Sequence, residues 1–319
     1  MRPLILCTTD ALQPFSEEIG EKTRQPVAVR RIERLPEERR DQVRIVITFG
    51  NYDDSVSSAE LRSLPRLEWI QVISSGIEQL PLEYLSERGI LVTTARGIHR
   101  IPMSEYVFSA LLYFAKKIPA YARLKRDKSW GCFETMEELY GKTIGILGTG
   151  QIGGEIAYKA KAFGMTTLGV NRSGRLVQHF DRIYPLSEWE HILPLCDYVC
   201  GVLPSAPETK QLINRRTIEQ MKDGVIFINV GRGDLVVEQD LVEALERGKI
   251  AGAALDVFAQ EPLDRRHPLW ELDNVIITPH ASAKTPMYVP RSLDIFYRNY
   301  ALFRQGRTHD MINLVKHPQ

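Results

Sequence analysis

Short apolar runs recur along the first hundred residues and are separated by polar or mixed segments. They lie at residues 3–7, 44–49, 67–73 and 90–94. Continuous apolar runs of this length are typical of buried strands, and the segments between them are long enough for crossover helices. The pattern predicts a parallel sheet covered by helices, which would form a first α/β unit.

A second series of apolar runs begins at Thr143 and has six members. In chain order they are TIGILG, TTLGV, YVCGVL, VIFINV, IAGAALDV and NVIITP. Helix-compatible segments lie between them, for example at 153–163 and 238–247. Six strands alternating with helices match the doubly wound sheet of nucleotide-binding domains.

Two other helical patterns connect these units. Residues 101–125 predict one long helix joining the two units, and residues 289–304 predict an amphipathic helix that returns to pack on the first unit. The expected fold class is therefore α/β, with two Rossmann-like doubly wound parallel-sheet domains and a cleft between them. The predicted boundaries are 1–99 plus 286–319 for one domain and 100–285 for the other.

Charge and composition exclude several classes of function. The chain has 319 residues with 41 Lys+Arg against 40 Asp+Glu, and no long block of one sign, so neither nucleic acid nor a membrane is an expected partner. No run approaches the roughly 20 apolar residues of a membrane span, and the N-terminal run is too short for a signal peptide, so we expect a cytoplasmic protein. The four cysteines lack a metal-binding spacing, and we expect core thiols and no metal site.

A glycine-rich segment follows the first strand of the second series and opens a helix. Gly148 permits a tight turn, Gly150 lets the backbone approach a pyrophosphate, and Gly153 allows close contact between helix and strand. The helix N-terminus would offer free N–H groups to the phosphates. The predicted dinucleotide site consists of Gly148, Thr149, Gly150, Gln151, Ile152 and Gly153.

The end of the following strand bears on the choice between NAD and NADP. An acidic residue about 20 positions after the glycines usually binds the ribose 2′-hydroxyl of NAD, but here the segment holds Asn171, Arg172 and Ser173. A guanidinium without a neighbouring carboxylate suits a 2′-phosphate, so NADP is favoured over NAD. In the alternative, Arg172 is solvated and Asn171 binds the ribose of NAD.

Three residues that suit hydride transfer to a keto acid each follow a predicted strand. Arg232 can clamp a carboxylate and polarise the adjacent carbonyl, and His280 can donate a proton to the carbonyl oxygen. Glu261 beside the imidazole would fix its tautomer and favour its protonated form. Active sites of such sheets lie beyond the carboxyl ends of the strands, so we expect these three residues to meet there.

The motifs together resemble those of the D-isomer-specific 2-hydroxyacid dehydrogenases. The likeness runs from about Val72 to Ser282 and includes SSGIEQLP, SEYVFSALL, GKTIGILGTGQIG, GVLPSAPETKQLI, INVGRGDLVVEQDLVEAL, AGAALDVFAQEPL and TPHAS. The resemblance implies an NAD(P)-dependent enzyme that interconverts a small 2-keto acid and its D-2-hydroxy acid. It places Arg232, Glu261 and His280 at the catalytic arginine, glutamate and histidine positions, and makes the first domain a flavodoxin-like substrate-binding domain.

Further expectations rest on the resemblance alone. Main-chain N–H groups of Ser75, Gly76 and Ile77 would bind the substrate carboxylate, Asp256 would contact the nicotinamide carboxamide, and Pro204 would line the adenine side. The family also implies a homodimer and closure of the two domains over the substrate. Trp130 lies where related reductases have a tryptophan that reaches a substrate pocket, the partner subunit's included; otherwise it is a packing anchor.

The sequence departs from the family pattern at two positions, and it leaves other functions to be weighed. Asn171 replaces an acid, and Glu78 stands where many relatives have aspartate. Only 39 residues follow His280, which favours glyoxylate or hydroxypyruvate reduction over a phosphoglycerate dehydrogenase-like activity. A dinucleotide-binding corepressor-like module without turnover is the alternative from another class. A formate dehydrogenase is disfavoured because Glu261 would there be a glutamine.

Overall fold

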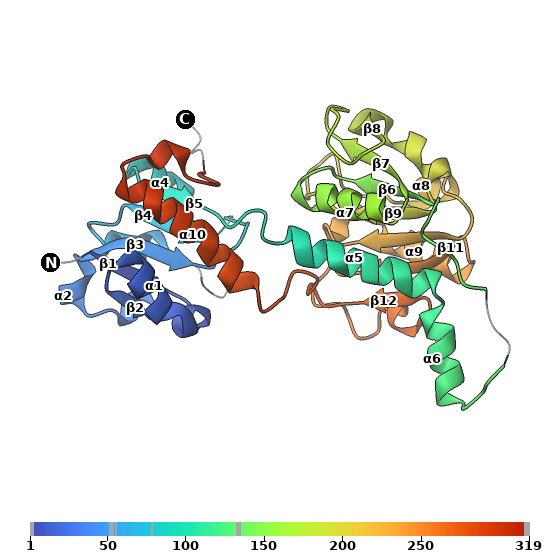
Figure 1. Ribbon diagram of the computed structural model, residues 1–319, viewed down its shortest axis with the longest axis horizontal. Coiled ribbons are helices and arrows are strands. Elements are labelled where there is room, and N and C mark those ends of the chain that lie inside the picture. Colours follow the sequence, from blue (N-terminus) through green and yellow to red (C-terminus); the bar gives the residue numbers. More distant parts are fainter. Residues whose placement is uncertain (1–2, 51–53, 55, 78, 132–134, 316–319) are drawn as a thin grey trace. The chain divides into compact units, whose positions relative to one another are not determined.

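The computed structural model describes residues 3–50, 54, 56–77, 79–131 and 135–315 of the 319. The chain divides into two compact units. Unit 1 comprises Met1–Ile98 and Thr285–Gln319, and unit 2 comprises His99–Lys284. Each unit has its own parallel sheet, which confirms the predicted class of two parallel-sheet α/β domains (Figure 1).

Unit 1 is built on five parallel strands in the order β2-β1-β3-β4-β5, the flavodoxin-like order. Four of the strands coincide with the predicted runs, but β2 was not predicted, because a three-residue strand carries too little pattern to be distinguished from a loop. The elements are β1 (Leu4–Cys7), η1 (Asp10–Phe15), α1 (Ser16–Thr23), β2 (Val27–Val29), η2 (Ile32–Arg34), α2 (Glu37–Arg40), β3 (Val43–Thr48), α3 (Ser58–Arg62), β4 (Trp69–Val72), α4 (Leu82–Glu87), β5 (Leu91–Thr93), α10 (Tyr288–Arg304) and η7 (Thr308–Asp310).

Successive residues of these strands point into two different cores, one on each face of the sheet. Leu4 and Leu6 belong to the core beneath α3 and α4, whereas Ile5 and Cys7 belong to the core beneath α1 and α10. The returning helix α10 contributes Phe296, whose ring stacks on Trp69 with centroids 5.2 Å apart. The prediction that the C-terminal helix packs on the first unit is therefore confirmed.

Unit 2 is built on seven parallel strands in the order β12-β11-β10-β9-β6-β7-β8. This is the Rossmann order extended by one strand, and the chain reverses direction across the sheet at β6. The elements are α5 (Arg100–Ala115), α6 (Ile118–Arg126), β6 (Thr143–Leu147), α7 (Gln151–Ala162), β7 (Thr166–Asn171), β8 (Arg182–Pro185), η4 (Leu186–Leu195), β9 (Tyr198–Gly201), α8 (Arg215–Glu219), β10 (Val225–Asn229), η5 (Gly233–Leu235), α9 (Glu238–Glu246), β11 (Ile250–Leu255), η6 (Pro268–Glu271) and β12 (Val275–Ile277).

Two expectations about unit 2 were wrong. The predicted count of six strands missed β8, whose four residues RIYP include an arginine and a proline and so lack an apolar run. The predicted single helix over 101–125 is two helices, because Pro119 has no N–H to donate and its ring would clash with the carbonyl four residues earlier. Lys117, at φ 52°, turns the chain between α5 and α6.

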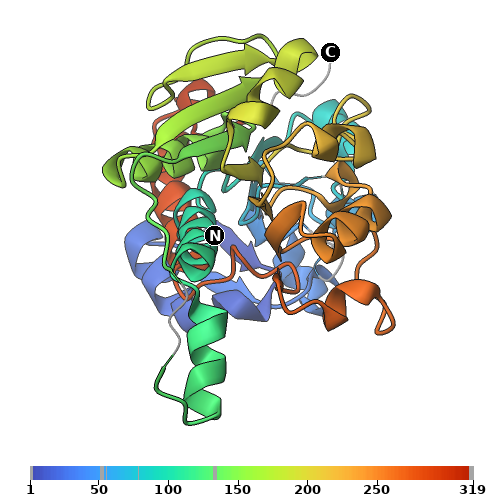
Figure 2. The ribbon, with the colours of Figure 1, turned by 90° about the vertical axis from the view of Figure 1, so that its right-hand side faces the viewer.

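Helix α6 projects from the rest of unit 2 in both views (Figures 1 and 2). No residue of α6 is buried. Trp130 follows this helix and is 96% exposed. It is therefore not a packing anchor within this chain, and its predicted role at a substrate pocket stays a prediction.

Candidate active site

The glycine turn after β6 has the geometry that a pyrophosphate requires. Gly148 adopts φ +114°, which side chains rarely allow. A Cβ on Gly153 would lie 1.9 Å from the carbonyl oxygen of Gly148, so this glycine lets α7 pack directly on the turn. Gly150 has no atom within 4 Å of the place where a Cβ would be, and a ligand can use that open space.

Helix α7 begins at Gln151 with Gly150 as its N-cap, and no side chain caps it. The first N–H groups of a helix have no partner within the helix and, with the helix dipole, attract anions. The exposed Gly150 and Gln151 leave this end open to solvent. The residues thus fit the diphosphate of a dinucleotide.

Asn171 ends β7 and organises the turn that follows. Its amide nitrogen donates to Thr149 Oγ1 at 3.0 Å and to the carbonyl oxygen of Arg175 at 2.9 Å, while its Oδ1 accepts from the Ser173 N–H at 3.1 Å. This network ties the end of β7 to the glycine turn. Arg172 is the next residue; its side chain is 87% exposed and lies 3.2 Å from Glu208.

The structure brings His280 and Glu261 into direct contact. His280 Nδ1 lies 2.9 Å from Glu261 Oε2. Because a carboxylate only accepts, Nδ1 carries the proton of this bond, and Nε2 is the nitrogen left to exchange a proton with a substrate. The other carboxylate oxygen, Oε1, accepts from the Phe258 N–H at 3.1 Å, so both oxygens of Glu261 have partners.

The segment that carries His280 is held by Asp256. His280 has φ +50°, the left-handed region that a non-glycine residue adopts at some energetic cost. Its N–H donates to the Asp256 carbonyl oxygen at 2.8 Å. The buried Asp256 carboxylate also accepts from the N–H groups of Ala281 and Ser282. These bonds compensate the local strain and fix the direction of the imidazole.

A further link reaches Asp256 from helix α5. Thr278 Oγ1 lies 2.6 Å from Asp256 Oδ1 and 2.9 Å from the Tyr106 phenol oxygen. Since the carboxylate takes the one hydroxyl proton of Thr278, the phenol of Tyr106 donates to Thr278. Burial raises the pKa of Tyr106, so the phenol keeps this proton. Thr278 and Tyr106 both lie in the motifs quoted above, TPHAS and SEYVFSALL, but neither was assigned a role.

Arg232 follows β10 in a turn that Asn229 shapes. Asn229 is buried; its amide nitrogen donates to the Arg232 carbonyl oxygen at 2.9 Å, and its Oδ1 accepts from the Gly231 N–H. The Arg232 guanidinium donates to the Gly231 carbonyl oxygen at 2.8 Å and, across the described part of the chain, forms no ion pair with a carboxylate. It therefore has N–H groups available for a substrate carboxylate.

Gly233 joins this turn to the turn that carries Glu261. A Cβ on Gly233 would lie 1.9 Å from the Phe258 carbonyl carbon. The two backbones therefore touch, which brings Arg232 and Glu261 onto adjoining turns. No direct contact between Arg232 and either Glu261 or His280 is seen among the described residues.

The pKa of His99, which lies at the start of α5, is affected by burial and by the charge of Arg232. Burial lowers the pKa of His99, and the charge of Arg232 lowers it further. The ordinary pKa of histidine is near 6.5, and it applies to the unfolded chain. The native state therefore binds a proton at His99 only at a lower pH than the unfolded chain does. His99 was not among the predicted site residues, because no sequence pattern places it near Arg232.

We expect stability to fall at acid pH through His99. Below about pH 6.5 the unfolded chain gains a proton that the native state does not, so the free energy of unfolding decreases as the pH falls. Urea unfolding at pH 7.5 and 5.5 should show a larger loss for the wild type than for His99→Gln. An equal loss in both proteins would contradict this assignment.

The remaining predicted site residues lie at loops. In unit 1, Ser75, Gly76 and Ile77 follow β4, with Ser75 exposed and Ile77 partly packed on the core. In unit 2, Pro204 is exposed. Its segment packs closely on the turn before Arg232, because a Cβ on Gly231 would lie only 2.8 Å from the carbonyl oxygen of Leu203. Glu78 lies outside the described residues.

The cysteines confirm the expectation of core thiols where they are described. Cys7, Cys196 and Cys200 are buried, and burial raises the pKa of each to about 12. Cys132 lies outside the described residues. Within the described ranges, no group of three or more His, Cys, Asp or Glu side chains could hold a metal ion, and no helix is long and apolar enough to cross a membrane.

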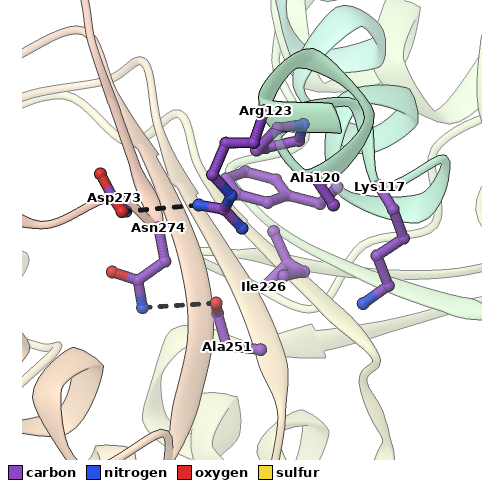
Figure 3. Close-up of a pocket in the computed structure, with 9 residues that line it drawn as sticks. Lys117, Ala120, Arg123, Ile226, Ala251, Asp273 and Asn274 are labelled. Atoms are coloured by element: carbon purple, nitrogen blue, oxygen red, sulfur yellow. Dashed lines mark hydrogen bonds and ion pairs between the residues drawn. The ribbon is translucent and has the colours of Figure 1, made fainter. Parts of the chain in front are cut away.

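A pocket lies at the opposite edge of the same sheet. Ile226, Ala251 and Asn274 line it at the amino ends of β10, β11 and β12, beneath Lys117 and Arg123 (Figure 3). Arg123 pairs with Asp273 at 3.4 Å across this pocket. Arg232, Asp256 and His280 follow the carboxyl ends of those strands, so the pocket is separate from the candidate active site.

The fold of unit 2 and its open glycine turn define a dinucleotide-binding protein. The family described as D-isomer specific 2-hydroxyacid dehydrogenase, NAD binding domain, matches residues 108–282. The glyoxylate reductase of Aeropyrum pernix is 32% identical over 262 residues, which are 80% of this chain and 78% of that protein. The D-3-phosphoglycerate dehydrogenase of Archaeoglobus fulgidus is 34% identical over 72% of this chain, which spans 44% of that longer protein.

Solved structures agree with these relatives. A D-isomer specific 2-hydroxyacid dehydrogenase family protein from Aeromonas salmonicida superposes with a TM-score of 0.83 at 33% identity, covering all of both chains. The D-lactate dehydrogenase of Aquifex aeolicus, complexed with NAD and lactic acid, gives a TM-score of 0.75 at 27% identity over 99% of this chain and 100% of that chain. The chain belongs to the D-isomer specific 2-hydroxyacid dehydrogenase family and is an oxidoreductase of that family.

Proposed function

We propose that this enzyme reduces a short 2-keto acid of the glyoxylate or hydroxypyruvate kind to its D-2-hydroxy acid, with NADPH preferred over NADH. The observation that carries the proposal is the 2.9 Å contact between His280 Nδ1 and Glu261 Oε2, beyond the carboxyl edge of a dinucleotide-binding sheet. A proton donor is needed there because the carbonyl oxygen gains negative charge as its carbon is reduced.

Each of the three residues has a separate task in this proposal. The Arg232 guanidinium pairs with the substrate carboxylate and turns the carbonyl towards the imidazole. Protonated His280 donates from Nε2 to the carbonyl oxygen, and Glu261 stabilises the imidazolium through Nδ1. The nicotinamide, when bound, supplies the hydride. The balanced reaction consumes one keto acid, one reduced dinucleotide and one proton, and yields the hydroxy acid and the oxidised dinucleotide.

The proposed substrate and cofactor contacts extend beyond these three residues. The N–H groups of Ser75, Gly76 and Ile77 bind the substrate carboxylate, Asp256 contacts the nicotinamide carboxamide, and Pro204 lines the adenine side. The assembly is a cytoplasmic homodimer, the arrangement that family membership favours. Trp130 contributes to a substrate pocket. All of these rest on family likeness.

The preference for NADPH rests on the turn after β7. Asn171 presents no carboxylate that would repel a 2′-phosphate, and Arg172 is exposed beside it. A surface ion pair such as Arg172–Glu208 is worth at most about 1 kcal/mol, so it is readily exchanged for a phosphate.

Replacing Arg172 with glutamine tests this preference. Loss of the guanidinium should raise KM for NADPH about tenfold, since a charge-assisted pair contributes roughly 1.5 to 3 kcal/mol. KM for NADH should change less than about twofold, because NADH carries no 2′-phosphate. Arg266→Gln is the matched control, because Arg266 is 92% exposed and also lies beside an acid. Equal effects of Arg172→Gln on both cofactors would refute the assignment.

The function itself is tested by a panel of substrates. Glyoxylate, hydroxypyruvate, pyruvate and a phosphorylated three-carbon 2-keto acid would be assayed at 340 nm with NADH and NADPH in parallel. Highest kcat/KM for glyoxylate or hydroxypyruvate supports the proposal. Highest kcat/KM for the phosphorylated acid would instead make the enzyme phosphoglycerate dehydrogenase-like. Tight dinucleotide binding without turnover of any acid would favour a corepressor-like module.

A further inference from the structure

The turn that carries Glu261 lacks regular secondary structure and is largely exposed. Ala259, Gln260 and Glu261 follow β11 and Phe258, and all three are exposed. Glu261 bonds the N–H of Phe258 within the same turn, which shapes the turn but does not attach it to the domain. Because a displacement of about 1 Å can lower a rate a hundredfold, such a turn needs external support.

Glu238, the first residue of α9, supplies one attachment. Its Oε1 accepts from the N–H of Ala259 at 2.8 Å, two residues before Glu261. The Glu238 side chain is 19% exposed, whereas Ala259 on the turn is exposed. Gly233 touches the backbone of the same turn, at Phe258 and Ala259. The turn is thus held by a carboxylate and by a glycine contact.

His267 lies beside the other carboxylate oxygen of Glu238. The Leu269 N–H donates to His267 Nδ1 at 3.3 Å, which leaves the ring proton on Nε2. Nε2 lies 3.4 Å from Glu238 Oε2, and the His267 side chain is 21% exposed. Each oxygen of Glu238 therefore faces its own donor, one from the Glu261 turn and one from His267.

We propose that Glu238 and His267 are positioning residues for catalysis, which hold the turn of Glu261 so that its carboxylate meets His280. The inference rests on the proposed function for its kinetic consequences. The ordinary alternative is that Glu238 only stabilises the N-terminus of α9, where an acid interacts favourably with the helix dipole. That alternative involves neither Ala259 nor His267.

Amide exchange tests the structural half of the proposal without any turnover. Glu238→Ala should increase the exchange rate of the Ala259 amide at least tenfold, because that N–H loses its acceptor. The matched control is Glu188→Ala, since Glu188 and His191 form another Glu–His pair, 3.9 Å apart and largely exposed. Unchanged exchange at Ala259 in Glu238→Ala would overturn the proposal, whether or not the enzyme reduces keto acids.

Kinetics test the catalytic half. Glu238→Ala should lower kcat for reduction about tenfold and leave the dinucleotide Kd within about twofold, because the turn orients Glu261 and not the cofactor. His267→Ala should lower kcat about threefold, and His267→Gln should restore it, since the glutamine amide can donate to Glu238 in place of Nε2.

The kinetic outcomes separate positioning from simple destabilisation. If Glu238→Ala does not fold, the His267→Ala and His267→Gln pair decides, because the proposal requires rescue by the residue that keeps the donor. Equal kcat in both His267 variants, or a loss confined to the melting temperature, would overturn it. A wild type that reduces no keto acid would refute the proposed function, and exchange at Ala259 would still test the attachment of the turn.

Discussion

Replacing His280 with glutamine is expected to lower kcat for keto-acid reduction about a thousandfold, since a positioned general acid contributes roughly 10² to 10⁴. Glutamine preserves a hydrogen-bonding group beside Glu261 but cannot deliver a proton from an imidazolium. The dinucleotide Kd should stay within about twofold, because the glycine turn that fits the diphosphate lies after a different strand, β6.

Stopped-flow turnover and fluorescence titration of NADPH check both halves of this prediction. His191→Gln is the matched control; His191 is a surface histidine beside Glu188 and should leave both quantities unchanged. Normal turnover by the His280 variant would show that another group donates the proton.

Gly153→Ala is expected to weaken dinucleotide binding at least about a hundredfold. The new Cβ would lie 1.9 Å from the Gly148 carbonyl oxygen and 3.0 Å from its carbonyl carbon, both backbone atoms. Helix α7 must then move away from the turn, which displaces the N–H groups that fit the phosphates and costs about 1 to 3 kcal/mol of stability through overpacking.

Gly154→Ala is the matched control in the next position of the same helix. No atom lies within 4 Å of a Cβ there, so alanine should stabilise the helix by roughly 0.5 to 1 kcal/mol. Calorimetric titration with NADPH and urea unfolding would measure both effects. Equal affinities in the two variants would mean that the contact between Gly153 and the turn does not shape the dinucleotide site.

The contact between His280 and Glu261 could be anticipated because both residues follow strands of one parallel sheet. Carboxyl ends of parallel strands share an edge, so residues 19 apart in sequence approach each other. The support of that contact could not be anticipated in the same way. The Ala259 N–H donates to the side chain of Glu238, and the Thr278 hydroxyl donates to the side chain of Asp256; no periodicity in the sequence records such pairs.

Some strands could likewise be predicted from the sequence and others could not. Runs such as VIFINV in β10 are apolar on both faces because helices cover both sides of the sheet, and this makes them visible in the sequence. Strands β2 and β8 have three and four residues, and they are defined by their pairing with β1 and β7 rather than by an apolar run of their own. Pro119 was visible within 101–125, but the continuous helical pattern around it outweighed its effect as a helix breaker.

The amino-acid sequence by itself determined the α/β class, the glycine turn after β6 and the order of the strand ends that bear the candidate catalytic residues, because each depends on local runs and on the shared direction of parallel strands. Tertiary structure alone decided the left-handed backbone of His280, the engagement of both Asp256 oxygens and the attachment of the Glu261 turn by Glu238. Those features depend on hydrogen bonds between segments distant in the chain, which form only once the sheet has brought them together.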